Sequence, residues 1–320
     1  MKSHSRQRRL AALALGLALV GAGCGDGAET PGPEPRSRPE GDLVAQVANH
    51  ELVAREESRF LIGLLTIDNL FVTAGTAELR FSFLAEGAGP ELYREEVAFF
   101  LPIPGEEPGH EHAQAGPPSE GRGVYVVLSI VFDRPGFWQV QAIVDLGNDD
   151  VRSGIAAFEV LSEPEVPAVG ERAPLTENLT LDSNASPAAV DSRAQSRGEI
   201  PDPELHETTI ADAIRAGRPP LAIFSTPVFC ISQFCGPITE MVEGLAHDFG
   251  DRAAFIHVEI WRDHQEGVIN QAAADWLLRD ENLTEPWVFL IGADGRIAAR
   301  WDNVATREEI EPLLRQLPTS

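Results

Sequence analysis

Cysteine and methionine are scarce in this chain, which has three cysteines and two methionines in 320 residues. The shortage of methionine argues against a methionine-rich copper site, because such a site needs several thioether ligands. Basic side chains are also few, with 25 lysines and arginines against 50 aspartates and glutamates, a net charge of −25. A surface of this sign repels phosphate backbones, so we expect no nucleic acid partner.

The apolar run near the N-terminus, from Leu10 to Val20, is shorter than the roughly 20 residues that a membrane-spanning helix needs. Basic residues precede it, and the small residues 21–23 follow it. This is the order of a secretory signal peptide. We therefore predict that residues 1–23 direct export, where a disulfide can persist.

The segment Gly21-Ala22-Gly23-Cys24 resembles a bacterial lipobox. The resemblance implies that Cys24 is acylated and anchors the protein to the cell membrane, facing the extracytoplasmic side. Gly21 stands where the usual leucine is expected, so cleavage of a plain signal nearby remains the alternative. Residues 24–42 are rich in glycine, proline, glutamate and arginine, which predicts a disordered tether.

Residues 43–162 follow a period of two. Ala77 to Phe83 alternates apolar and polar side chains, residues 124–132 form a longer apolar run, and Pro135-Gly136 marks a turn. Several short strands separated by turns over about 120 residues are typical of an immunoglobulin-like β-sandwich. We predict no catalytic residues in this first domain.

A second break spans residues 163–203, where prolines are scattered among polar residues without a sustained period. This composition predicts a linker or a strap lying over a neighbour. In residues 204–320 strands alternate with helices, and the predicted helices include 237–249, the longest, and 268–278. The order predicts a second, α/β domain with a central sheet covered by helices on both faces.

Two cysteines lie just after the predicted strand 221–225. The loop from Phe224 to Cys230, and then Cys235-Gly236-Pro237, resemble the active-site loop and the Cys-Gly-Pro-Cys motif of the thioredoxin superfamily. Glu285-Pro286-Trp287 stands where that family has its cis-proline. The resemblance covers roughly residues 203–317. It implies a thioredoxin-like fold, thiol–disulfide exchange with extracytoplasmic protein thiols or disulfides, and substrate binding at Glu285 and Pro286.

The spacing of the two cysteines restricts where they lie. Five residues of helix advance about 7.5 Å, beyond comfortable disulfide reach, so Cys230 belongs in the loop and Cys235 at the start of the helix. The positive end of the helix dipole lowers the pKa of a thiol placed there, which favours Cys235 as the attacking thiolate and Cys230 as the resolving one. Counting residues from the strand end favours Cys230 as the nucleophile instead.

Two departures from the family pattern keep other functions open. Residues 221–224 contain no acidic residue, whereas this strand in thioredoxins usually carries a buried acid that helps proton transfer. A purely structural disulfide in an envelope lipoprotein is therefore one alternative. The other is a copper-binding assembly module similar to the Sco-type branch of the superfamily, although this chain has four residues between its cysteines where that branch has three. The leading hypothesis needs no cofactor.

The histidines are weaker candidates for metal binding. His257 lies in a predicted strand, where a histidine is more often a satisfied core residue than a ligand. His110 and His112 are spaced so that they could share a metal, but a solvated polar loop is the simpler interpretation.

Overall fold

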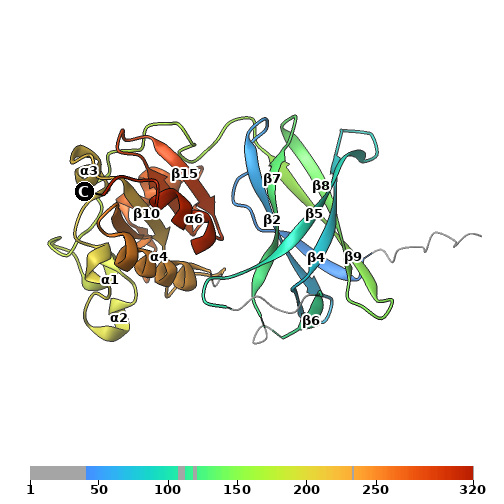
Figure 1. The fold of residues 1–320 in the computed structure, drawn as a ribbon, viewed down its shortest axis with the longest axis horizontal. Coiled ribbons are helices and arrows are strands. Elements are labelled where there is room, and N and C mark those ends of the chain that lie inside the picture. Colours follow the sequence, from blue (N-terminus) through green and yellow to red (C-terminus); the bar gives the residue numbers. More distant parts are fainter. Residues whose placement is uncertain (1–40, 107–111, 118–120, 233, 320) are drawn as a thin grey trace, which may run out of the picture. The chain divides into compact units, whose positions relative to one another are not determined.

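Residues 43–160 form an antiparallel β-sandwich (Figure 1). The structure is a computed structural model, and it describes residues 41–106, 112–117, 121–232 and 234–319. Nine strands pair in the order β6-β3-β2-β7-β5-β4-β8-β9, with β1 on β2. Their bounds are β1 Leu43–Val47, β2 Glu57–Thr66, β3 Phe71–Thr73, β4 Thr76–Phe83, β5 Glu91–Pro102, β6 Gln114–Gly116, β7 Gly123–Val131, β8 Gly136–Asp145 and β9 Val151–Val160.

The alternation of the sequence explains the sandwich core. In β4, Ala77, Leu79 and Phe81 are at most 1% exposed, because successive side chains of a strand point to opposite faces. Phe81 packs edge-on against Phe60 with 4.8 Å between ring centroids. Each buried aromatic side chain of this kind contributes about 1.5–3 kcal/mol to stability. The antiparallel sandwich is thus a direct result of period-two patterning.

Residues 163–206, here called the strap, run from the sandwich to the second half of the chain. The strap contains α1 (Pro187–Val190), α2 (Ala194–Arg197) and the 3-10 helix η2 (Pro203–Leu205). Its first part lies beside β15 (Ile297–Asp302), where Gly170 N donates to Ile297 O at 2.8 Å. Several strap side chains are buried, so this segment lies over its neighbours rather than acting as a free linker.

The second half contains a four-stranded sheet in the order β11-β10-β14-β15. β10 (Pro220–Ser225) is parallel to β11 (Ala254–Glu259) and antiparallel to β14 (Trp287–Ile291), and β15 is antiparallel to β14. A separate pair is formed by β12 (Trp261–Asp263) and β13 (Val268–Ile269). The helices are α3 (Ile210–Arg215), α4 (Cys235–Phe249), α5 (Gln271–Leu277) and α6 (Arg307–Leu314).

Alternate residues of β10 enter two separate apolar cores. Ala222 and Phe224 join a core with Trp276 of α5. Leu221 and Ile223 join the other core, to which α4 contributes. β10 is buried along its whole length, and its C-terminal end is therefore a fixed support for the loop that follows.

The predicted fold class is wrong. We expected an immunoglobulin-like sandwich followed by an α/β thioredoxin-like fold, but strands predominate over helices in the described residues, and a thioredoxin-like second half is not shown. Residues 38–320 form one compact unit. α4 has 15 residues, whereas α6 has eight and α5 seven. The predicted helix 268–278 shows one physical reason. Val268 and Ile269 pair with β12, and Asn270 uses its side chain to donate to Glu259 O, so the helix begins only at Gln271.

Polar contacts join the sandwich to the second half within this unit. Arg59 of β2 donates from Nη1 to Glu309 Oε1 at 2.8 Å and from Nη2 to Val304 O at 2.7 Å. Asn303 Nδ2 donates to Ala48 O at 2.8 Å. Arg59 donates to two points of the second half, Glu309 and Val304. These two contacts fix the orientation of the second half against β2 as well as the distance between them.

Candidate functional site

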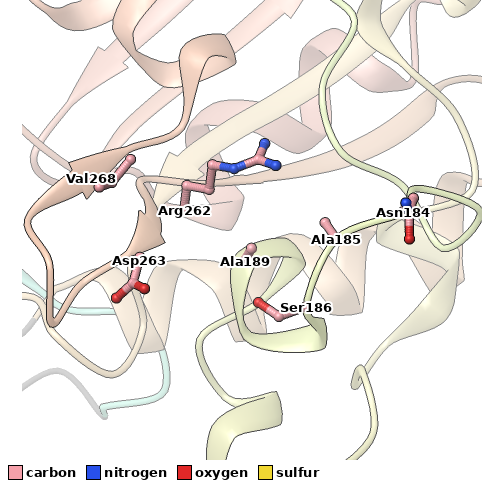
Figure 2. Close-up of a pocket in the computed structure, with 7 residues that line it drawn as sticks. All are labelled: Asn184, Ala185, Ser186, Ala189, Arg262, Asp263 and Val268. Atoms are coloured by element: carbon pink, nitrogen blue, oxygen red, sulfur yellow. The ribbon is translucent and has the colours of Figure 1, made fainter.

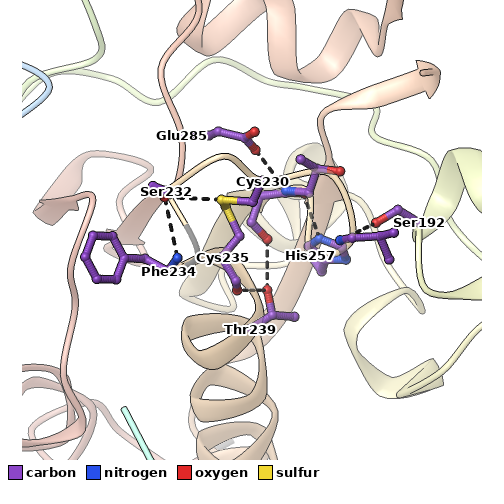
Figure 3. The surroundings of a disulfide bond; sticks show 11 residues. Ser192, Cys230, Ser232, Phe234, Cys235, Thr239, His257 and Glu285 are labelled. Atoms are coloured by element: carbon purple, nitrogen blue, oxygen red, sulfur yellow. Dashed lines mark hydrogen bonds between the residues drawn. A yellow bond between two sulfur atoms is a disulfide. The ribbon is translucent and has the colours of Figure 1, made fainter. Parts of the chain in front are cut away.

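The Cys230–Cys235 disulfide closes the loop between β10 and α4 (Figure 3). The two Cα atoms are 6.1 Å apart, Cys230 lies in the loop, and Cys235 is the first residue of α4. This is the placement that the spacing predicted. Pro237 is the third helical residue rather than the first, and its missing N–H still costs nothing because the first four N–H groups of a helix lack an intrahelical partner.

The loop is held by hydrogen bonds at both ends. Cys230 N donates to Thr226 O at 3.1 Å, which forms a turn directly after the buried strand. Thr239 Oγ1 lies 2.9 Å from Ser225 Oγ, and it donates to Cys235 O at 2.8 Å. These contacts fix the start of α4 against the end of β10.

The two cysteines differ in exposure. Cys235 is fully buried, whereas Cys230 is half-buried. The next residue, Ile231, is 98% exposed. A reagent or partner from solution therefore meets Cys230 first, which opposes the role of attacking thiolate that the helix dipole predicted for Cys235.

Glu285 places a carboxyl group beside the disulfide. One of its oxygens and the two sulfur atoms all lie within 4.8 Å of one another, and Glu285 Oε2 accepts from Thr226 N at 2.9 Å. Burial and the nearby negative charge of Glu259 raise the pKa of Glu285 to about 8. Residues 221–224 contain no acidic side chain. The carboxyl group beside the disulfide comes instead from Glu285, which lies just before β14.

Pro286, predicted to shape substrate binding, follows Glu285 through a cis peptide bond. Its carbonyl oxygen accepts from Asn303 N at 2.9 Å, so this group is already used within the chain.

A groove of about 630 Å³ lies beside the disulfide. The second half contributes Cys230, Ile231 and Glu285, and strands β1 and β2 contribute Gln46 and Leu65. Its lining is largely apolar, with the Glu285 carboxyl as a polar group beside the sulfur atoms.

A second group of titratable side chains is fully buried where the strap meets β11. Asp191, His206 and His257 have no side-chain exposure, and Asp191 Oδ2 lies 3.4 Å from His206 Nε2 and 3.3 Å from His257 Nδ1. Arg193 Nη2 bonds the same carboxylate at 2.7 Å.

The environment separates the pKa values in this buried group. Burial lowers the pKa of His206. Burial also opposes the charged form of His257, but contact with Asp191 raises its pKa above the usual value. Burial would raise the pKa of Asp191, yet the contacts with His206, His257 and Arg193 hold it far below its usual range. These contacts therefore favour the ionised form of Asp191.

The predicted metal candidates fall in different places. His257 lies in β11 and joins Asp191 and His206, two residues that the sequence analysis missed because the strap has no periodic pattern. His112 is exposed, and His110 lies outside the described residues, as does Cys24 with the predicted signal and most of the tether.

Another hollow lies between the strap and the β12–β13 pair (Figure 2). Small residues such as Ala185 and Ala189 line it, with Arg262 and Asp263 on the opposite side. None of its lining residues belongs to the disulfide loop or to either titratable group.

Comparison with known proteins gives little support for any family. No family model matches the chain, and no curated protein matches it. Among solved structures, it is similar to the CARDB domain of the PF1109 protein in complex with di-metal ions from Pyrococcus furiosus. That match is 12% identical, covers 38% of this chain and 88% of that chain, and has a TM-score of 0.22, too low to support a conclusion.

No helix in the described part of the chain is long and apolar enough to span a membrane.

Proposed function

We propose that this protein is an exported thiol–disulfide oxidoreductase that acts through Cys230 and Cys235. The observation that carries the proposal is the pairing of one half-buried and one fully buried cysteine with a carboxyl oxygen within 4.8 Å of both sulfur atoms. A purely structural disulfide needs neither an accessible sulfur nor a neighbouring acid. The likeness of the cysteine loop and of residues 285–287 to thioredoxin motifs also supports exchange chemistry.

The exchange begins at Cys230. A thiolate of a partner protein attacks Cys230 Sγ, a new S–S bond forms, the Cys230–Cys235 bond breaks, and its electron pair stays on Cys235 Sγ. The Glu285 carboxyl donates its proton to this leaving thiolate and becomes a carboxylate. A raised pKa of about 8 suits this role, because an ordinary thiol has a pKa of about 8.5 and the proton can pass either way.

The second half of the exchange releases the partner. Its second thiolate attacks the partner sulfur of the mixed disulfide, and Cys230 leaves as a thiolate. The partner dithiol has then lost two electrons and become a disulfide, while the Cys230–Cys235 pair has gained them. The same steps in reverse reduce a partner disulfide.

Export and anchoring complete the proposal. The N-terminal pattern of residues 1–23 and the lipobox-like Cys24 support an extracytoplasmic, lipid-anchored protein. In that location the partners are extracytoplasmic protein thiols or disulfides.

The test is the reduction potential of the Cys230–Cys235 pair in the chain that begins at Gly25. Glutathione or dithiothreitol redox buffers set the potential, and mass spectrometry counts the thiols. A potential between about −270 and −120 mV fits exchange-active proteins, whereas one below about −300 mV indicates a structural bridge and contradicts the proposal. Copper that stays bound in one equivalent and is lost in Cys230→Ser would favour the assembly module instead.

A further inference from the structure

The buried group of Asp191, His206 and His257 brings together three segments that are distant in the sequence. Asp191 follows α1 of the strap, His206 follows η2, and His257 lies in the middle of β11. One ligand atom from each of the three lies within 4.8 Å of the other two. Full burial of two imidazoles and a carboxylate is costly unless each polar atom has a partner.

The direction of the His257 ring leaves an acceptor facing an acceptor. His257 Nε2 lies 3.1 Å from Ser225 O, a carbonyl that can only accept, so this nitrogen carries the proton (Figure 3). In a neutral ring Nδ1 is then a lone pair, and it faces the Asp191 carboxylate at 3.3 Å. The contacts of His257 Nδ1 and His206 Nε2 with Asp191 Oδ2, at 3.3 and 3.4 Å, are long for hydrogen bonds, and these nitrogens have no other partner within the described chain. A second proton on His257, the form that contact with Asp191 favours, would resolve the conflict, and so would a metal cation between these atoms.

Two of the three distances between the ligand atoms match a tetrahedral metal site. Zinc ligands lie about 2.0–2.1 Å from the ion, so two ligand atoms of a tetrahedron lie about 3.3–3.4 Å apart. The distances from Asp191 Oδ2 to His257 Nδ1 and to His206 Nε2 are 3.3 and 3.4 Å.

The surroundings provide the outer-shell contacts that metal ligands usually have. A metal-bound histidine commonly donates its other N–H to a backbone carbonyl, as His257 does to Ser225 O. A metal-bound carboxylate is commonly hydrogen-bonded in turn, as Asp191 is by Arg193. The guanidinium of Arg193 is also paired with Asp202, which balances its charge beside the site.

We propose that Asp191, His206 and His257 bind a divalent transition metal ion of the zinc type. The ion fixes the strap to β11. Because Ser192 follows Asp191 and its Oγ accepts from Val228 N at 3.3 Å, the site also positions the start of the cysteine loop. This proposal does not depend on the redox function.

The test uses zinc itself on a chain with the triple substitution Cys24→Ser, Cys230→Ser and Cys235→Ser, so that no thiolate can bind metal. The protein is loaded with zinc, dialysed against a weak chelator and measured by elemental mass spectrometry. We expect about one zinc ion per chain, and a loss of affinity of at least tenfold in His206→Gln. His247→Gln, which changes an exposed histidine, is the matched control and should retain the ion.

A second measurement needs no substitution among the ligands. Cobalt(II) bound to the same cysteine-free chain should give the intense visible bands of a tetrahedral site without a sulfur charge-transfer band. Zinc should also raise the melting temperature of this chain. Failure to retain zinc, together with the absence of a cobalt spectrum, would overturn the proposal and leave a proton on His257 as the cation. Equal zinc retention by a folded His206→Gln variant would overturn it as well.

Discussion

The two titratable groups of the second half differ in how they meet solvent. Cys230 is half-buried beside a groove, whereas Asp191, His206 and His257 have no exposure at all. Both groups adjoin the C-terminal end of β10: the cysteine loop follows Ser225, and His257 contacts the carbonyl of Ser225. The same buried strand thus supports a partly exposed disulfide loop and a fully buried polar group. Both groups contain side chains capable of chemistry, so their difference in exposure is what leads us to propose disulfide exchange for the first and metal binding for the second.

The largest expected effect tests whether accessibility decides which cysteine reacts. Cys230→Ser should abolish disulfide exchange, because the remaining Cys235 thiol is buried. Cys235→Ser should instead leave a reactive Cys230 that is trapped as a mixed disulfide with a model dithiol. The rate of reaction with a chromogenic disulfide, compared between these two matched variants, measures the difference, and we expect at least a hundredfold. Equal rates in the two variants would show that the difference in burial between Cys230 and Cys235 does not decide which cysteine reacts.

A substitution in the buried group should mainly affect stability. Asp191→Ala removes the buried carboxylate that Arg193 contacts and leaves Arg193 paired with Asp202 alone, and removing one partner of a buried ion pair costs roughly 3–5 kcal/mol. Urea unfolding measures this loss. Asp212→Ala, which removes an exposed carboxylate from a surface pair with Arg215, is the control and should change the free energy of unfolding by less than about 1 kcal/mol. A loss of less than about 1 kcal/mol in Asp191→Ala would show that the Asp191 contacts contribute little to the stability of the fold.

Glu285→Gln tests the acid beside the disulfide. It keeps the shape of the side chain but removes the proton donor, so we expect exchange to slow about tenfold or more. The rate in the unsubstituted protein should also change near pH 8, where the raised pKa of Glu285 lies, and this inflection should vanish in the variant. Unchanged rates with the inflection intact would exclude Glu285 as the donor.

The same carboxyl should affect stability with a defined sign. Because the folded-state pKa of Glu285 is raised from 4.5 to about 8, the folded state binds more protons than the unfolded state between these pH values. Glu285 therefore makes the protein less stable as the pH rises from 4.5 to 8. Urea unfolding should show a steeper decline for the unsubstituted chain than for Glu285→Gln across this window. Parallel curves would contradict the raised pKa.

The smallest expected effect concerns the support of the disulfide. Thr239→Val removes the hydroxyl that contacts Ser225 and Cys235, which should cost about 1–2 kcal/mol of stability. The exchange rate should change little, because Cys230 and Glu285 stay in place. A large loss of exchange would mean that the position of the start of α4, rather than access to the half-buried Cys230, limits the rate of exchange.

Local patterns predicted the individual elements better than the fold class. The alternation of residues 77–83 predicted β4, and the apolar spacing of residues 237–249 predicted α4. The fold class was wrong because local periodicity does not report how many strands join one sheet or where a helix stops against a neighbour. Residues 268–269 had helical spacing but were recruited into β13 by pairing with β12. Sheet pairing between distant segments decided that outcome.

The local sequence is enough to place the cysteine pair, since five residues of helix are too long for a disulfide and one cysteine had to lie in the loop. The two-residue period likewise places the strands of the sandwich. The difference in burial between Cys230 and Cys235 depends on the folded chain, because residues from other elements cover Cys235. Likewise, only chain folding brought Glu285 to the disulfide and joined Asp191 and His206 to His257. The local sequence around these residues carries no signal of their contacts, because each partner is separated in sequence and is brought close by sheet pairing and by the strap.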